Sequence, residues 1–390
     1  MKILYLGCFR LPNYDAAAPR VLNNARAMLL CGHDVSFISW GGKYNEDHLC
    51  EDGKYRIDGM EYIITDELDP KGSLVSKMMQ MLHRGNKTIA ILEAMKVKPD
   101  LIVMYNADYG WTKRMQKYCK QYNIKLANDI TEWYDNNELH FWDILPYHYN
   151  MTRLQRKVRN KICISSYLNK YYAESNNLLL PPLCDPSESK WKANVEDDRI
   201  KPFDGITLIY AGNPAKKDCV HSVINVVNKL AIEGKAIRFI ILGTTRDSYL
   251  NRYADLLVSK NLHEYILFLG RVSQDLIPAY YKKADFMVLL RETTRKNMAG
   301  FPTKFAESMT AGVPVIANIT SDLDKYISNG KTGYIVEDMK AESLEKILID
   351  VLAMSRFHID SMKQNVQYCN DAFNYAKRIV DMKLFLEKLF

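Results

Sequence analysis

The sequence predicts an α/β protein made of two doubly wound domains. Short apolar runs alternate with segments of helical spacing along most of the chain, a pattern typical of parallel sheets covered by helices. The chain has 390 residues, which suits two domains of common size better than one. A polar stretch that contains proline lies near the middle and separates the two sets of alternating segments.

The first domain is predicted to span residues 1–185. Lys2–Gly7 and Asp34–Ser39 are apolar runs typical of strands, and Val21–Cys31 between them has helical spacing, so the three predict one βαβ unit. The alternation continues with the predicted strands Leu101–Tyr105, Lys125–Asp129 and Ile162–Ser165 and the predicted helix Tyr109–Tyr122.

The second domain is predicted to span residues 203–372, after the boundary stretch Pro181–Pro202. The last segment, about residues 373–390, is helical in pattern. We expect it to pack back on the first domain, although a surface helix of the second domain fits the same pattern. The predicted strands of the second domain are Thr207–Ala211, Arg238–Gly243, Ile266–Gly270, Asp285–Leu290 and Val313–Ala317, and its predicted helices include Leu276–Lys283 and Phe305–Ala311.

Composition excludes several classes of protein. The chain is 47% hydrophobic and 25% charged, which indicates a folded globular protein. No run approaches the roughly 20 apolar residues of a membrane helix, so a cytoplasmic location is expected. The net charge of +7 favours phosphate-bearing ligands or an anionic membrane, and no pattern indicates nucleic acid as a partner. The 8 scattered cysteines lack zinc spacing and are expected to be reduced thiols.

Glycine-containing loops follow two predicted strands of the second domain. In one loop, Gly300 allows close approach of the backbone, and a helix starting near Pro302 offers free N–H groups to a diphosphate. Glu307 lies about one and a half turns into that helix, within reach of a ribose. In the other loop, Gly212 is followed by two lysines, Lys216 and Lys217, and a lysine in this place would neutralise phosphate charge. Each pattern alone is also compatible with an ordinary turn and solvated side chains.

In combination, these motifs resemble the family 4 retaining glycosyltransferases of the GT-B fold. The stretches YAG with KKD, FLGRV, GFPTKFAES and AGVPVIAN occur in the family's order in the C-terminal half, and the unit containing CGHDV is loosely similar in the N-terminal half. The resemblance implies two Rossmann-like domains facing each other across a cleft. It also implies transfer of a sugar from a nucleotide diphosphate donor to a glycan or lipid-linked acceptor, in the synthesis of a bacterial surface polysaccharide.

The family's donor-site roles transfer to individual positions. Lys217 matches a lysine that contacts the diphosphate and assists its departure, and Glu307 matches the carboxylate that holds the ribose. Gly212 belongs to the phosphate turn, whereas Arg271 and Val272 belong to the turn that holds the base. The backbone loop that cradles the diphosphate and sugar corresponds to Gly300, Phe301, Pro302, Thr303 and Lys304.

Two positions depart from the family pattern. The family's usual first acidic residue, eight positions before the ribose carboxylate, is Ala299 here. The arginine often found directly after the glycine of the phosphate turn is Asn213. The first departure matches a subgroup that shares the AGFPTKF form, and it requires that the sugar hydroxyls be recognised in another way.

In the first domain, Asp129 and Glu132 follow a predicted strand at a position where the family often has a histidine or an acid near the reacting sugar. We predict that one of them orients the acceptor hydroxyl. Arg20 is predicted to approach phosphate or the acceptor from the same domain. Surface acids and a solvated arginine fit the same pattern.

The resemblance implies no bound metal and no cofactor, because lysine and helix N–H groups offset the charge of the leaving diphosphate. The nucleotide sugar is a substrate, with a UDP-sugar favoured over a GDP-sugar. A nucleotide-sugar epimerase would need paired acid and base residues that the sequence does not display. A regulator that binds a nucleotide sugar without turnover is compatible with Ala299, but the retention of Lys217 and Glu307 favours transfer.

The segment 71–98 has the pattern of a basic amphipathic helix that lies peripherally on the inner face of the cell membrane. The alternative is that its methionines pack in the core of the first domain. Its basic residues are Lys77, His83, Arg84 and Lys87, and its apolar residues are Leu74, Val75, Met78, Met79, Met81 and Leu82.

Overall fold

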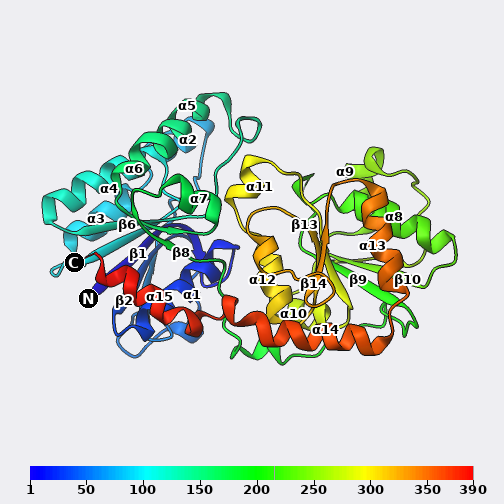
Figure 1. The fold of residues 1–390 in the computed structure, drawn as a ribbon. Coiled ribbons are helices and arrows are strands. Elements are labelled where there is room, and N and C mark those ends of the chain that lie inside the picture. The colour runs from blue at the N-terminus through cyan, green and yellow to red at the C-terminus, as the bar shows by residue number, and fades with distance from the viewer. Residues whose placement is uncertain (215, 390) are drawn as a thin grey trace. The chain divides into compact units, whose positions relative to one another are not determined.

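The computed structural model describes residues 1–214 and 216–389 and divides the chain into two compact units. The first unit contains Met1–Asp185, Ala299–Phe301 and the residues from Asn374 onward, and the second contains Pro186–Met298 and Pro302–Phe373. Each unit is built on a largely parallel sheet with helices on its faces (Figure 1). Phe390, the last residue of the predicted C-terminal segment, lies outside the described residues.

The sheet of the first unit has the strand order β3-β4-β2-β1-β5-β6-β7-β8, in which only the β3–β4 pair is antiparallel among the described strands. The chain leaves β1 toward β2 and later returns to its other side as β5, so the direction of winding reverses at β1. The strands are β1 (Lys2–Leu11), β2 (Asp34–Gly42), β3 (Arg56–Ile57), β4 (Met60–Ile64), β5 (Leu101–Tyr105), β6 (Lys125–Ile130), β7 (Asn160–Cys163) and β8 (Asn176–Leu179). The helices are α1 (Ala17–Leu30), α2 (Leu74–Leu82), α3 (Asn86–Ala94), α4 (Tyr109–Tyr122), α5 (Phe141–Tyr149), α6 (Gln155–Lys157), α7 (Ser166–Tyr171) and α15 (Ile379–Glu387).

Both faces of this sheet are buried, because alternate residues of its strands enter different hydrophobic clusters. On β1, Ile3 and Tyr5 belong to the cluster that includes α1, whereas Leu4 and Leu6 belong to the cluster that includes Trp111 of α4. The continuous apolar character that predicted the strand is therefore the consequence of a sheet covered on both sides.

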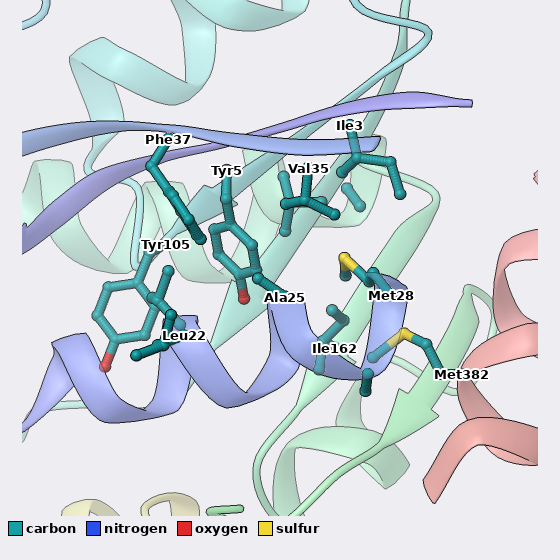
Figure 2. Close-up of a cluster of buried hydrophobic side chains, with 14 of the residues drawn as sticks. Ile3, Tyr5, Leu22, Ala25, Met28, Val35, Phe37, Tyr105, Ile162 and Met382 are labelled. Carbon is teal, nitrogen blue, oxygen red and sulfur yellow. The ribbon is translucent and has the colours of Figure 1, made fainter. Parts of the chain in front are cut away.

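The C-terminal helix α15 completes the first of these clusters. Met382, Phe385 and Leu386 are buried in the same cluster as Met28 of α1 and Ile162 of β7, and Figure 2 shows Met382 among these side chains. The helical pattern predicted from about residue 373 is only partly present. The segment begins with the 3₁₀ turns Asn370–Phe373 and Tyr375–Arg378, and the α-helix itself starts at Ile379.

The second unit has a parallel sheet with the order β11-β10-β9-β12-β13-β14. The predicted strand Ile266–Gly270 has the same bounds in the structure, and the other predicted strands differ by one or two residues at their ends. The strands are β9 (Ile206–Ala211), β10 (Ile237–Leu242), β11 (Ile266–Gly270), β12 (Phe286–Leu289), β13 (Val315–Asn318) and β14 (Gly333–Val336). The helices are α8 (Val220–Ile232), α9 (Arg246–Tyr253), α10 (Ile277–Lys282), α11 (Arg295–Ala299), α12 (Thr303–Thr310), α13 (Ala341–Leu352) and α14 (Arg356–Cys369).

The segment 71–98 is two helices and not one. The helical conformation is interrupted between α2 and α3 at Gly85, which has a φ of +91°. A Cβ atom at Gly85 would lie 2.3 Å from the ring of Trp111, so this position accepts only glycine. Met78 and Met79 of α2 are 58% and 47% exposed. The alternative that the methionines pack in the core is therefore wrong for Met78 and Met79, whereas Met95 after α3 does pack against a core cluster. The side chains of Met81 and Leu82 lie outside the described residues.

We predict that Phe385→Ala destabilises the first unit by about 3–5 kcal/mol, because it removes a buried aromatic side chain from the core cluster. The matched control is Leu384→Ala on the same helix, where the side chain is 52% exposed. Differential scanning calorimetry of the full chain should show a lower Tm for Phe385→Ala and nearly the wild-type Tm for Leu384→Ala. Equal effects of the two substitutions would contradict the packing of α15.

Candidate functional site

The candidate site of the second unit lies at the carboxyl ends of β9 and β12. Winding reverses here, because the chain runs from β9 through β10 to β11 and then returns to the other side of β9 as β12. In open parallel sheets, ligands bind at such a switch point, outside the carboxyl ends of the strands. The predicted residues Gly212 and Lys217 follow β9, and Arg291 follows β12.

Glycines without side chains allow the strand ends to come together at this edge. Gly212 has a φ of +130° and Gly243, after β10, has a φ of +99°. A Cβ atom on Gly243 would lie 2.4 Å from the backbone of Gly212. The N–H of Gly243 donates to the carbonyl of Gly270 over 2.7 Å. The predicted phosphate turn is thus held in place by backbone contacts that a side chain would prevent.

The carboxylate of Asp218 is the centre of a buried polar network at the same edge. It accepts hydrogen bonds from the Tyr210 hydroxyl at 2.6 Å, from Arg291 Nε at 2.7 Å and from Lys304 Nζ at 3.0 Å. Only 1% of its side chain is exposed. Burial alone would raise the pKa of Asp218, but the neighbouring Arg291 and Lys304 hold it well below its ordinary value.

Lys217 lies beside this network in the 3₁₀ turn Lys216–Asp218, and its side chain is partly buried. Desolvation lowers the pKa of Lys217, as do the positive charges of Arg291 and Lys304, while Asp218 raises it. Among the described residues, its ammonium makes no hydrogen bond or ion pair. This ammonium is partly buried, has no partner among the described residues and lies near other cations. A bound anion would stabilise it, because the anion would offset this uncompensated positive charge.

Helix α12 carries the predicted ribose carboxylate. The helix begins at Thr303, one residue after Pro302, and Glu307 is partly buried on its second turn. Burial raises the pKa of Glu307, whereas Lys190 and Lys304 lower it. Its carboxylate has no hydrogen-bond partner among residues 1–214 and 216–389, so its acceptor positions are available to hydroxyl groups.

The other predicted donor residues lie at the ends of strands and helices. Arg271 is exposed and Val272 is partly buried directly after β11. Gly300 and Phe301 belong to the short segment that is counted with the first unit. In that segment the carbonyl of Ala299 accepts a hydrogen bond of 2.6 Å from Ser165.

In the first unit, Asp129 is enclosed at the end of β6. Its carboxylate accepts hydrogen bonds from Arg20 of α1 at 2.7 Å, from the Tyr5 hydroxyl at 2.6 Å and from Asn24 at 3.1 Å. The side chains of Arg20 and Asp129 are 2% and 0% exposed. Arg20 also donates to the carbonyls of Leu180 and Pro181.

The structure therefore places Asp129 and Arg20 against each other and away from solvent, which favours a structural role over the predicted contacts with acceptor and phosphate. Glu132 differs from them. It lies in the loop after β6, is partly exposed, and accepts a hydrogen bond from the hydroxyl of Tyr134. Of the two predicted acids, Glu132 has the carboxylate that a substrate can reach.

Sequence reasoning missed Asp218, Arg291 and Tyr210 as members of the donor-side network. Asp218 and Arg291 each lie in the connection that follows a buried strand of a parallel sheet, so attention to charged residues in such connections would have selected both. Their pairing over 73 positions was not visible in the sequence.

Residues 194–368 match the family model of glycosyl transferases group 1. The putative colanic acid biosynthesis glycosyltransferase WcaL of Salmonella typhimurium is 26% identical over 159 residues, which are 40% of this chain and 38% of WcaL. The match thus spans well under half the length of that relative.

Solved structures match over the whole chain. The sucrose-phosphate synthase from Thermosynechococcus elongatus has a TM-score of 0.70 and 16% identity, covering 100% of this chain and 99% of that one. Anabaena HepE in complex with UDP-glucose has a TM-score of 0.67 and 13% identity, with the same coverage. The fold is that of the GT-B glycosyltransferases. The GT-B architecture predicted from the sequence, with two Rossmann-like domains, is confirmed.

In the described parts of the chain, no group of three or more His, Cys, Asp or Glu side chains is placed to hold a metal ion. None of the helices in those parts is long and apolar enough to cross a membrane.

We predict that Asp129→Asn lowers the stability of the first unit by about 3–5 kcal/mol, because it leaves the guanidinium of Arg20 buried without its counter-charge. The double variant Arg20→Met with Asp129→Asn should lose less stability than the two single variants combined. Thermal unfolding measures both effects. If Asp129→Asn kept the wild-type Tm but lost turnover, the catalytic role predicted from the sequence would stand instead.

Proposed function

We propose that this protein is a retaining glycosyltransferase that moves a sugar from a nucleotide diphosphate donor to a glycan or lipid-linked acceptor in the synthesis of a bacterial surface polysaccharide. The observation that carries the proposal is the ammonium of Lys217, which has no partner among the described residues and lies at the switch point of a unit that matches glycosyl transferases group 1. The relationship to WcaL, a putative colanic acid biosynthesis glycosyltransferase, supports the assignment to polysaccharide synthesis.

The donor binds with its diphosphate at Lys217 and its ribose at Glu307. The free N–H groups at the start of α12 point in the direction that favours an anion, and the turn containing Arg271 and Val272 follows β11 at the same edge of the sheet. The neighbour HepE is described in complex with UDP-glucose, which supports a UDP-sugar as the donor.

Departure of the diphosphate is the step that the cations of this site assist. As the bond from the sugar to the diphosphate breaks, negative charge grows on the leaving phosphate, and the ammonium of Lys217 stabilises it without rearrangement. Lys217 thereby acts in the role that a divalent metal fills in other transferases, so we propose metal-independent transfer. Glu132, the accessible acid of the first unit, is the proposed partner of the acceptor hydroxyl.

We expect Lys217→Ala to weaken binding of the nucleoside diphosphate and also to lower kcat, because the lost charge stabilises both the bound and the departing diphosphate. Glu307→Gln should mainly weaken binding, by roughly 1.5–3 kcal/mol if its bonds to ribose are charge-assisted. Isothermal titration with UDP and with GDP measures both losses and identifies the base.

The control for these two variants is Lys346→Ala, on the exposed surface of α13. All three variants should unfold at the wild-type Tm, because none removes core volume. Wild-type affinity in folded Lys217→Ala and Glu307→Gln would falsify the donor site. Hydrolysis or transfer of the donor sugar by the wild-type protein separates an enzyme from a regulator that only binds it.

We also propose a peripheral membrane location, and the evidence for it is the exposed apolar surface of α2. Leu74, Val75, Met78 and Met79 are 84%, 67%, 58% and 47% exposed on one short helix, and Lys77 is exposed among them. Such a surface inserts apolar side chains into a bilayer while lysine meets anionic headgroups. Lys87, by contrast, forms an ion pair with Asp66 and contributes less to that attraction.

We predict that Leu74→Ser with Met78→Ser reduces sedimentation with anionic vesicles at least tenfold, because each apolar side chain contributes about 1.5–3 kcal/mol when buried. Val258→Ser is the matched control, since this valine is 90% exposed but belongs to the second unit. If the wild-type chain fails to sediment with anionic vesicles at low salt, the membrane proposal is wrong.

A further inference from the structure

The side chain of Lys304 lies directly against the phosphate turn. A Cβ atom on Gly212 would be 2.5 Å from Lys304 Cε and 3.1 Å from its Nζ. Lys304 therefore crosses from α12 to the end of β9 and fills the space that the absent side chain of Gly212 leaves. Its ammonium also lies 5.1 Å from the ring centre of Tyr210, the last residue but one of that strand.

Asp218 holds Lys304 in this position and leaves part of its ammonium free. The hydrogen bond from Nζ to Asp218 uses one of the three N–H donors of the lysine. The Lys304 side chain remains 19% exposed, in contrast to 7% for Arg291. Asp218 is bonded to Lys304 and Arg291, and Lys217 lies close enough to feel its charge. These four side chains together carry an excess of positive charge.

The sequence departs from the family pattern at this same turn. Asn213 stands directly after Gly212, where the family that the motifs resemble often has an arginine, and its side chain is exposed. The chain therefore lacks the cation that follows the glycine, yet it has a different cation in contact with that glycine. Both observations have one explanation if Lys304 replaces the arginine that is absent at position 213.

We propose that the ammonium of Lys304 binds the donor diphosphate at the Gly212 turn in place of the arginine absent at position 213, with Asp218 as its positioning residue. This inference rests on the proposed donor site. It goes beyond that site because it gives the Lys304 side chain a role, where the family resemblance assigned this position only a backbone contact. The diphosphate is then held between two lysines, Lys217 from the turn after β9 and Lys304 from α12.

The test compares ligands with and without phosphate in the full chain. Lys304→Gln removes the charge but keeps an N–H donor for Asp218, so the variant is expected to fold. Isothermal titration should show roughly 10- to 100-fold weaker binding of the nucleoside diphosphate, as expected for losing a charge-assisted bond, and unchanged binding of the matching nucleoside. Lys346→Gln on α13 is the control and should bind both ligands as the wild type does.

A rescue variant separates a phosphate contact from a packing role. Adding Asn213→Arg to Lys304→Gln returns a cation to the same turn and should recover most of the lost affinity for the diphosphate. Thermal unfolding checks each variant, and Lys304→Met replaces Lys304→Gln if the latter does not fold. Recovery would support the replacement of one cation by the other, whereas a folded double variant without recovery would overturn it.

The outcomes also distinguish this inference from the donor site itself. If the wild-type protein does not bind nucleoside diphosphates, the donor site fails and the inference fails with it. If the wild type binds and Lys304→Gln binds equally well, only the role of Lys304 is overturned. If Lys304→Gln loses nucleoside and diphosphate binding to the same extent, Lys304 supports the shape of the site and does not contact phosphate.

Discussion

A buried carboxylate joins three parts of the second unit that are distant in sequence. Asp218 follows β9, Arg291 follows β12, and Lys304 comes from α12, and their side chains meet at one edge of the sheet. A carboxylate that is 1% exposed is costly unless cations surround it, and a cluster of cations is equally costly without the carboxylate. Because the carboxylate and the cations each need the other, Asp218 fixes the positions of Arg291 and Lys304. Lys304 in turn lies against the turn at Gly212.

The first unit also contains a buried aspartate bonded to an arginine and a tyrosine, but its surroundings differ. Asp129, the last residue but one of β6, also meets an arginine and a tyrosine hydroxyl, but its pairing with Arg20 is closed to solvent. The charges of Asp129 and Arg20 are satisfied by each other, and their bonds join α1 to β6. Around Asp218 the cations exceed the carboxylate, so positive charge remains for a ligand. The ratio of cations to carboxylates, and not the residue types, is what differs between the closed Asp129 pair and the proposed donor site.

Much of the fold was predictable because periodicity is a local property of sequence. The helix Tyr109–Tyr122 and the strand Ile266–Gly270 have the same bounds in the structure as in the prediction, since Asp108 and Asn123 cap the helix and a glycine ends the strand. The break at Gly85 was not predictable, because it depends on the ring of Trp111 packing against that position. The burial of Asp129 was missed for the same reason: its partner Arg20 is 109 positions away. At the donor side, the sequence indicated Lys217 and Glu307 but not the network that holds Lys304.

The first unit contains segments from both ends of the chain, and this affects how it folds during synthesis. Residues up to Asp185 supply its sheet, but Met382, Phe385 and Leu386 of the same core cluster come only after the whole second unit. At a translation rate of about 5–20 residues per second, the interval between Asp185 and Asn374 lasts roughly 10–40 s. During that time, α1 and its neighbouring strands lack the helix that covers them, and their apolar side chains are open to wrong partners. All residues of the second unit lie between Asp185 and Asn374. Its core is therefore complete without a segment from elsewhere in the chain.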